Sequence, residues 1–316
     1  MAKASVTSAP GGFEFDITDL AQVSSTTRLW RALKNAAWEL WRNRIACVGA
    51  VMVVILLLVS VLAPVFATHD PVKQNYRQML QPPSAEHYFG TDKFGRDIWS
   101  RTVWGCQRLI TIAVVAVIIG LLGGIPLGTI SGYYGGRLDA ILMRVVDAWL
   151  AFPGILFYLL AATFIRAYEL SLFWNTVGLI IALGVARMPD IARLVRGQVM
   201  AEREKEYIEA SHIVGEPNLY IAFRQILPNC LSPVIIQSTV ALGVELLIIS
   251  SLSFLGLGAP PPTPDWGADL NLAREHMVTR PYLAIFPGLA ISFAVLGFNL
   301  FGDGLRDILD PRTADR

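Results

Sequence analysis

Long runs without a charged residue dominate this sequence and limit what it can fold into. The clearest run extends from Ala46 to Ala67 and contains no Asp, Glu, Lys or Arg. An α-helix crosses the hydrocarbon core of a bilayer in about 20 residues. Only 16% of the 316 residues are charged, whereas soluble domains average about 25%. The sequence therefore predicts an all-α fold, a polytopic membrane helix bundle.

The apolar runs predict six transmembrane helices. The fourth is short, and the fifth is interrupted by a carboxylate. Six crossings put both termini on one side, and most of the 26 Lys and Arg residues then fall on that side. Because cytoplasmic loops carry the excess of Lys and Arg, we expect both termini in the cytoplasm. The predicted spans are 46–67, 109–134, 148–165, 170–186, 233–257 and 283–302.

The segments between the spans complete the predicted organisation. Residues 1–45 form a cytoplasmic tail, 68–108 an external loop and 303–316 a second cytoplasmic tail, and residues 109–302 form the core. In the first tail Trp30 and Trp41 belong to an apolar series at helical spacing with Arg and Lys beside it. This pattern is typical of a helix at the membrane surface, and the alternative is a solvated lead-in to the first span.

Cysteine, histidine and net charge indicate what the chain does not bind. The three cysteines are far apart, and the four histidines are scattered along the sequence. No disulfide framework or CxxC metal pattern is present, so we expect no metal site. The net charge of +1 gives no reason to expect a nucleic-acid partner, whereas membrane lipid is an expected one.

The predicted spans contain a pair of glycines at helical spacing and one carboxylate. Gly124 and Gly128 in the second span form a small-xxx-small pair, which allows close helix contact. Glu245 is the one carboxylate deep within a predicted span, and such a residue is costly unless it faces protein or water. It is either a contact on a translocation path or a residue paired at a helix interface.

The longest inner loop, 187–229, has an ordered character. Gly215 suits the C-terminal cap of a helix, and Pro217 suits the first turn of a new one. Leu219 and the apolar residues after it supply a surface, and Pro228 is expected to stop that helix before the fifth span. Such an amphipathic helix pair can lie on the bilayer, pack under its own bundle, or dock into a groove on a partner.

The same loop resembles the Glu-Ala-Ala loop of the membrane subunits of bacterial ATP-binding-cassette importers. That motif has Glu-Ala-Ala, a later glycine, and then Leu-Pro. Two departures are mild: a serine replaces the second alanine, and the isoleucine upstream of Leu-Pro is shifted by one residue to position 226. The matching residues are Glu209, Ala210, Ser211, Gly215, Leu227 and Pro228.

Further blocks narrow the resemblance to peptide-type permeases. FGTDKFGRDIWSR, residues 89–101, is similar to their Gly-Thr-Asp…Gly-Arg-Asp…Ser-Arg signature, and residues 254–267 and 298–312 resemble their closing segments. The signature residues either meet an external binding protein and brace a gate, or form salt bridges that fix the loop. They are Gly90, Asp92, Gly95, Arg96 and Asp97. Relatives also carry an acidic residue near position 249, where this chain has Ile249 and Glu245 lies one turn earlier.

The resemblance implies a C-type permease of a dipeptide, oligopeptide or nickel importer in the bacterial inner membrane, with the type I importer permease fold. It implies one homologous permease, two cytoplasmic ATPase subunits and an extracytoplasmic solute-binding protein as partners. No GxxxxGK[ST] phosphate loop occurs in the chain, so we expect no cofactor here, and ATP and Mg in the ATPases. A set of residues in this loop would then couple ATP hydrolysis to movement of the spans: Glu209, Ala210, Ser211, Gly215, Pro217, Leu219, Leu227 and Pro228.

Other functions remain as alternatives. The same family includes permeases for nickel, glutathione and sugars. An ion-driven secondary transporter usually shows charged residues in several spans and an internal repeat, and neither is evident. An intramembrane hydrolase would need a motif such as HExxH or GxSxG, and none is found. We therefore expect a transport subunit rather than an enzyme.

Overall fold

The computed structural model describes residues 43–168 and 171–309. The described residues are helical or loop, and none of them forms a named strand. The predicted surface helix around Trp30 and Trp41 lies outside these residues. The helices are α3 (Arg44–Val61), α4 (Ala63–Phe66), η1 (Tyr76–Gln78), α5 (Ile98–Tyr134), α6 (Gly136–Leu150), α7 (Gly154–Ala167), α8 (Leu172–Arg203), α9 (Glu206–Val214), α10 (Asn218–Tyr220), η2 (Ile221–Ile226), α11 (Leu227–Asn229), α12 (Leu231–Phe254), α13 (Trp266–Ala273), η3 (Arg274–His276) and α14 (Tyr282–Leu309).

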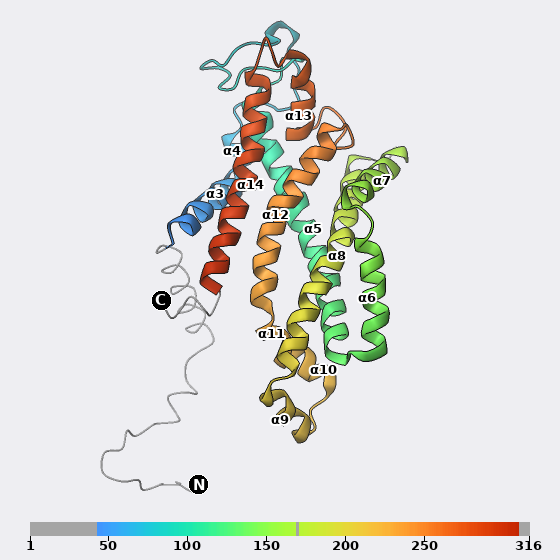
Figure 1. Cartoon of the computed structure of the whole chain (residues 1–316). Coiled ribbons are helices and arrows are strands. Elements are labelled where there is room, and N and C mark those ends of the chain that lie inside the picture. The colour runs from blue at the N-terminus through green and yellow to red at the C-terminus, as the bar shows by residue number, and fades with distance from the viewer. Residues whose placement is uncertain (1–42, 169–170, 310–316) are drawn as a thin grey trace, which may run out of the picture.

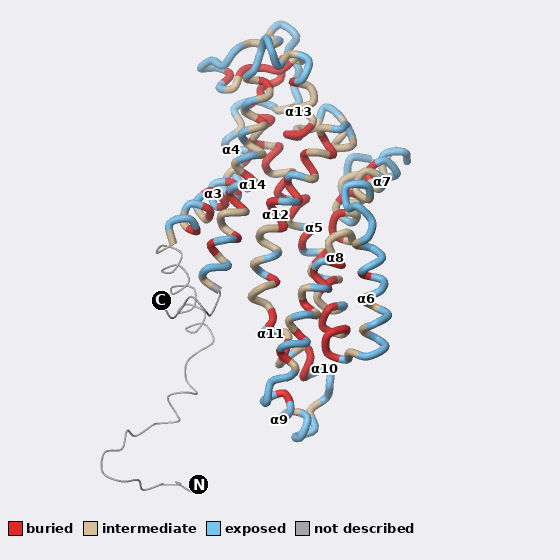
Figure 2. The backbone as a smooth tube through the Cα atoms, viewed as in Figure 1, coloured by how far each residue is buried: buried red, intermediate tan, exposed pale blue. Residues whose placement is uncertain are grey.

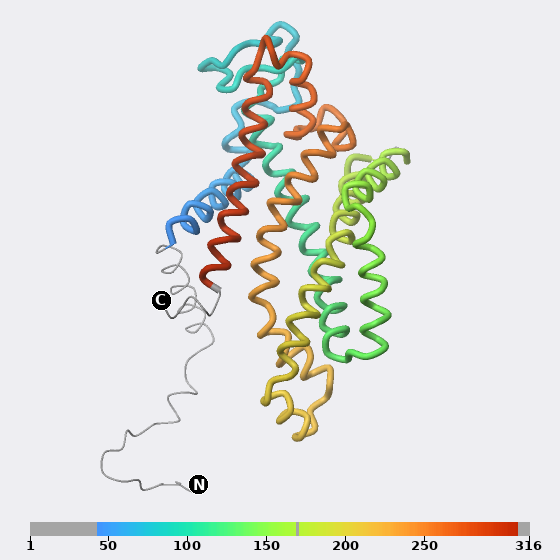
Figure 3. The backbone as a smooth tube through the Cα atoms, in the orientation of Figure 1, coloured from blue at the N-terminus to red at the C-terminus, as the bar shows by residue number. Residues whose placement is uncertain are grey.

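The long helices form an elongated bundle with two distinct ends (Figure 1). Successive passes through α3, α5, α6 with α7, α8, α12 and α14 alternate in direction (Figure 3). One end carries α13 and the loop that precedes α5, and the other carries α9, α10 and α11 (Figure 1). We refer to these as the α13 end and the α9 end.

Four helices are each long and apolar enough to cross a membrane: α3, α5, α12 and α14. A fifth crossing is available if α6 and α7 count as one span, although they meet at 78°. Length and composition thus support five of the six predicted spans if α6 and α7 count as one, and four if they do not. The predicted span 170–186 corresponds to the first half of α8, a 32-residue helix whose second half carries many charges.

Several helices do not end where the predicted spans end. The span 148–165 crosses the bend between α6 and α7, because Pro153 disfavours helical backbone in the residue before it and α7 starts at Gly154. α8 continues past Arg187 to Arg203, so the first part of the predicted inner loop is helical. Likewise, α5 starts at Ile98, inside the predicted external loop.

Small residues allow α5 and α8 to lie side by side over much of their length. A Cβ atom on Gly124 would lie 2.7 Å from the Ile191 Cβ, and one on Gly128 would lie 2.5 Å from the Ala192 carbonyl oxygen. Gly120 and Gly132 meet α8 in the same way, one turn before and one turn after. The predicted close contact at Gly124 and Gly128 is therefore confirmed, and α8 is its partner.

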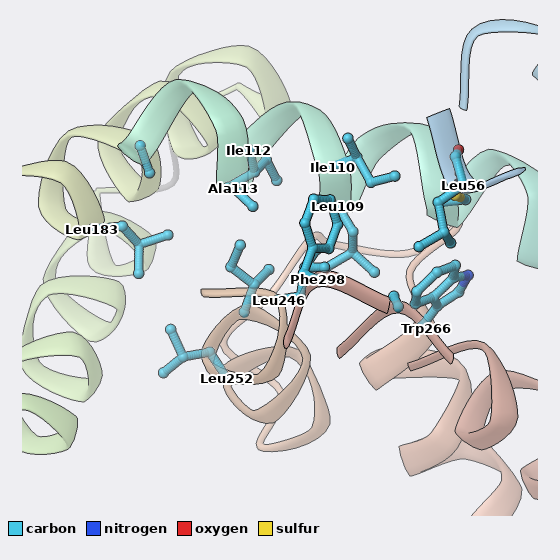
Figure 4. Packing of buried hydrophobic residues seen from close by; sticks show 14 of the residues in the cluster. Leu56, Leu109, Ile110, Ile112, Ala113, Leu183, Leu246, Leu252, Trp266 and Phe298 are labelled. Carbon is cyan, nitrogen blue, oxygen red and sulfur yellow. Dashed lines mark hydrogen bonds between the residues drawn. The ribbon is translucent and has the colours of Figure 1, made fainter. Parts of the chain in front are cut away.

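Buried apolar side chains from α3, α5, α8, α12, α13 and α14 form one cluster in the upper half of the bundle (Figure 4). Leu109, Leu246 and Phe298 pack near its centre, and Trp266 closes it toward the α13 end (Figure 4). A second cluster joins α8 to α9 and η2 at the opposite end. Outward-facing positions on the helices are largely exposed (Figure 2), as expected of helices that face lipid or another subunit.

Candidate functional site

The α9 end contains the helical hairpin predicted around Gly215. α9 ends at Val214, and Gly215 adopts a left-handed conformation with φ 85°. Its N–H donates to the His212 carbonyl oxygen at 3.0 Å, and the Glu216 N–H donates to that of Ser211 at 3.2 Å. These bonds and the left-handed backbone confirm the predicted glycine cap. Glycine suits this position, because the left-handed region is strained for residues with a Cβ.

A second helical stretch returns from this turn to the bundle. Pro217 lies at the N-terminal cap of α10 rather than inside its first turn. α10, the π-helix η2 and α11 then follow without an extended break, and Leu227 and Pro228 lie in α11. Pro228 does not separate this helical stretch from the next span by a loop. Only Cys230, with φ −94° and ψ −2°, lies between α11 and the start of α12 at Leu231.

Buried side chains fix this hairpin to the long helices. Ile208 of α9 is 2% exposed and packs with Ile221 and Ile226 of η2. The same cluster includes Val195 and Val199 of α8. Three segments thus share one apolar core, which fixes the hairpin against α8.

Polar contacts add to this attachment. The Ser211 hydroxyl donates to Gln225 Oε1 at 2.8 Å, and the Tyr207 hydroxyl donates to Glu202 Oε1 at 2.7 Å. Burial, together with the neighbouring Glu202 carboxylate, raises the pKa of Tyr207. The Asn218 side-chain oxygen accepts from the Tyr133 hydroxyl at 3.0 Å, which connects the hairpin to α5. The contacts of Tyr207 and Tyr133 could not be predicted, because their partners lie on other helices.

The outer surface of the hairpin is apolar and exposed. Ile213 and Val214 are 81% and 80% exposed, and Leu219 and Tyr220 follow at 58% and 48%. We call these four residues the tip patch. Leu219 was predicted to supply such a surface, whereas Ile213 and Val214 were missed, although two consecutive apolar residues before a glycine cap were a readable signal. Exposed apolar residues concentrated at one place mark an interaction surface.

The Glu-Ala-Ala positions lie beside the tip patch. Glu209 and Ala210 are exposed, and Ser211 is half-buried. Within the described chain the Glu209 side chain makes no hydrogen bond or ion pair that would hold it. A carboxylate at the surface of a two-turn helix, next to apolar side chains, is available to a donor on another molecule.

Glu245 lies in α12 and is fully buried. Its Oε1 accepts from Arg187 of α8, with 3.0 Å between Oε1 and the Arg187 Nη2. Arg187 also contacts Asp190 at 3.4 Å. Of the two alternatives left by the sequence, this geometry supports a residue paired at a helix interface. The pair connects α8 with α12, the two helices that also hold the α9 end.

An apolar groove lies between α5 and α12 near this pair. It has a volume of about 310 Å³ and is lined by Val117, Leu121, Val234, Ser238 and other residues of the two helices. Toward the α13 end, a second open cavity of about 470 Å³ borders Trp104, Gln107 and Arg108. Arg108 ended a predicted span in the sequence, but it lies inside α5.

The predicted external motif forms a tight turn at the α13 end. Asp92 and Arg96 form an ion pair at 2.6 Å, and Asp97 caps α5 by accepting from the Ser100 N–H at 2.8 Å. Gly90 and Gly95 have φ of 78° and 70°, and a Cβ on Gly95 would overlap the Asn75 carbonyl oxygen. The contacts are those of the structural alternative, in which salt bridges fix the loop.

Arg101 extends this turn to α13. Its guanidinium donates to Asp269 at 2.5 Å and to the carbonyl oxygens of Pro71, Pro262 and Thr263 at 3.0 to 3.2 Å. The Arg101 residue is 2% exposed. One arginine of α5 thus joins two loops and α13. Sequence reasoning missed this role, because Asp269 lies 168 residues away.

Comparison with family models places the chain among known proteins. Residues 124–315 match the model described as "Binding-protein-dependent transport system inner membrane component". Residues 31–83 match "N-terminal TM domain of oligopeptide transport permease C". Together the two matches cover the hairpin at the α9 end, the α12–α14 region and the first predicted span.

Individual relatives are similar to this chain over most of their length. The chain is 41% identical over 283 residues, 90% of both chains, to the dipeptide transport system permease protein DppC of Alkalihalophilus pseudofirmus. It is 40% identical over 298 residues to DppC of Haemophilus influenzae, covering 91% of this chain and 99% of that one. It is also 40% identical over 279 residues, 87% and 90% of the two chains, to the glutathione transport system permease protein GsiD of Escherichia coli.

A solved structure has the same fold. The MetNI methionine ABC transporter in inward-facing conformations matches with a TM-score of 0.54 at 18% identity. The match covers 67% of this chain and 98% of that chain. At this identity the likeness is one of fold, and it agrees with the predicted permease bundle.

Proposed function

Because this chain belongs to the binding-protein-dependent transport system inner membrane components, we propose that it imports dipeptides and short oligopeptides as one permease subunit of an ATP-driven transporter. The chain is a transport subunit and not an enzyme. The substrate class follows from DppC relatives, which match over about nine-tenths of the chain. ATP and Mg are bound by partner ATPases, and this chain carries no cofactor of its own.

The importer family implies ATPase and binding-protein partners. We propose two ATPases at the α9 end, one homologous permease beside this chain, and a solute-binding protein at the α13 end. Both termini then lie in the cytoplasm, as the distribution of Lys and Arg indicates. Lipid covers the remaining exposed apolar faces of the outer helices.

The observation that carries this proposal is the tip patch. Its four side chains are exposed in the isolated chain, yet the hairpin below them is held by buried Ile208 and by hydrogen bonds. A rigid segment with an apolar outer face suits a helix-in-groove contact. Seated in an ATPase groove, it would transmit movement of the ATPases to α8 and α12. Glu209 would accept a hydrogen bond from the groove.

The translocation path is proposed to lie along the groove between α5 and α12. This groove widens or closes when α12 rotates, and α12 is joined to the α9 end through α11. The Glu245–Arg187 pair keeps α8 and α12 together, so Glu245 acts on the path by fixing its wall. A ligand shifts such an equilibrium only through differential affinity for the two states, and ATP binding in the partners would supply that difference.

Glutathione import is the second candidate. It is favoured by one observation: GsiD matches with nearly the same identity and coverage as the DppC proteins. Both cargoes are short peptides with free carboxylates, so the two candidates share one chemistry. The binding protein that accompanies the chain would choose between them.

The test is uptake by reconstituted proteoliposomes. Vesicles containing this chain, its homologous permease, the two ATPases and the binding protein are loaded with ATP and given radiolabelled dipeptides or glutathione. We expect accumulation that requires both ATP and the binding protein. Accumulation driven by a proton or sodium gradient without ATP would refute the proposal, and preference for glutathione would select the second candidate.

A further inference from the structure

Two histidines of the segment between α4 and α5 meet at the α13 end. His69 follows α4, and His87 lies shortly before the external motif. Their ring centroids are 4.6 Å apart. Asp97, the cap of α5, lies against both rings: His87 Nδ1 is 2.9 Å from Asp97 Oδ1, and His69 Nδ1 is 4.0 Å from Asp97 Oδ2.

The three side chains offer ligand atoms that converge on one point. One nitrogen or oxygen from each lies within 4.8 Å of the other two. In a tetrahedral zinc site with bonds of about 2.0 to 2.2 Å, neighbouring ligand atoms are separated by roughly 3.3 Å. The distances of 2.9 and 4.0 Å from Asp97 to His87 and His69 lie on either side of this value. Each of the two distances to Asp97 therefore needs a shift of less than about 1 Å to reach this value, and the ligand atoms of the two histidines lie within 4.8 Å of each other.

Burial supports the same site. His87 is 3% and Asp97 2% exposed, so an ion held between them would be largely shielded from bulk water. The side chain of His69 is 38% exposed, which leaves the cluster accessible from solvent.

The surroundings hold two of the groups in place. Asp97 Oδ2 accepts from the Ser100 N–H at 2.8 Å, so the carboxylate is fixed by the first turn of α5. The backbone N–H of His69 donates to the Ser100 hydroxyl at 3.0 Å, which fixes the start of the loop to the same turn. Groups that orient metal ligands in this way strengthen metal binding.

We propose that His69, His87 and Asp97 form a binding site for one divalent transition-metal ion, with Zn²⁺ as the best fit. Imidazole nitrogen and carboxylate oxygen are ligands that zinc takes, and a water molecule would complete the coordination. The ion replaces the hydrogen bond between His87 and Asp97 and releases any proton that these groups share, so affinity falls as the pH is lowered. Its effect is to clamp the loop after α4 to α5. The proposal does not rest on the peptide-import function.

The test is zinc binding by the full-length chain in detergent, stripped of metal and titrated with Zn²⁺ in a calorimeter. We expect one zinc per chain for the unaltered protein. His69→Ala removes a ligand on the exposed side of the cluster and should weaken binding at least tenfold, because the loss of even a group that orients a ligand costs roughly tenfold to hundredfold. His276→Ala is the matched control, because His276 is only half-buried, lies at the same end and is not in the cluster. Its affinity should equal that of the unaltered chain.

A second readout separates ligation from folding. Co²⁺ in place of Zn²⁺ should give the visible absorption bands of a four-coordinate nitrogen and oxygen site, and these bands should be lost in His87→Gln. Failure of the unaltered chain to bind stoichiometric zinc would overturn the proposal. Equal affinity in His69→Ala and the unaltered chain, or an equal loss in His276→Ala, would overturn it as well.

Discussion

Val214→Asp is the substitution that most sharply separates docking from folding at the α9 end. Val214 is 80% exposed in the isolated chain, so the substitution should change the stability of this chain by no more than about 0.5 kcal/mol. If the tip patch is buried in an ATPase groove, the same position loses its apolar contact. Fully burying a valine contributes about 1.5 to 3 kcal/mol, and an unpaired carboxylate in that groove adds a desolvation cost.

The expected magnitude follows from these terms. A loss of about 2 kcal/mol corresponds to a roughly thirtyfold weaker complex, since 1.4 kcal/mol is a factor of ten. The assay is titration of the reconstituted permease pair with the ATPases, followed by ATP-driven uptake. Val278→Asp is the matched control, because Val278 is 96% exposed but lies at the α13 end beyond η3. Unchanged affinity of Val214→Asp for the ATPases, with Val278→Asp behaving identically, would refute the docking argument.

Four further outcomes are expected. Gly215→Ala meets no atom within 4 Å of the new Cβ but keeps φ at +85°, so about 1–2 kcal/mol of strain should lower uptake per ATP hydrolysed while the protein still inserts; normal coupling would contradict this. Arg101→Ala leaves a buried carboxylate and should cost roughly 3–5 kcal/mol, seen as a lower Tm that Arg101→Lys does not fully restore, because a lysine lacks the planar fork. Burial raises the pKa of Cys230 to about 11, so maleimide modification followed by mass spectrometry should be slow at pH 7 and accelerate as the pH rises toward 11; rapid modification at pH 7 would argue against this burial. Arg187→Ala alone should destabilise the bundle more than Arg187→Ala combined with Glu245→Gln, since the single variant leaves a buried charge without its partner; thermal unfolding in detergent measures both.

Local chemistry explains which parts of the fold could be read from the sequence. The apolar runs of α3, α5, α12 and α14 were visible as spans, because each helix is long and apolar enough to cross a membrane. The cap at Gly215 was readable as well, since only a few residue types tolerate the left-handed conformation. Both signals lie within a few residues of the structure that they specify.

Long-range pairing explains what was missed. Arg187 and the charges after it appeared to end the fourth span, yet α8 continues because these charges have partners on other helices. Arg187 pairs with Glu245 at 3.0 Å, and Arg196 pairs with Asp139 at 2.5 Å. Hydropathy counts each charge as solvated and therefore stops the helix too early. The roles of the coupling residues and of Glu245 stay predictions, because they depend on partners outside this chain.

Two clusters at the α13 end had no signal in the sequence at all. The Arg101–Asp269 pair spans 168 residues, and the two histidines of the proposed metal site appeared scattered. Only the folded loop brings His69 and His87 to within 4.6 Å of one another. Spacing rules detect metal ligands on one helix or hairpin, whereas these ligands are spread along the long segment between α4 and α5.

Protection of the tip patch tests the central claim most directly. A cysteine introduced as Val214→Cys is reacted with a membrane-impermeant maleimide in open membranes, with and without the ATPases, and Val278→Cys serves as the control. The unsubstituted chain corrects for its native cysteines. Docking at the α9 end predicts that the ATPases slow labelling at position 214 at least tenfold and leave position 278 unchanged. Equal labelling at position 214 with and without bound ATPases would contradict the account.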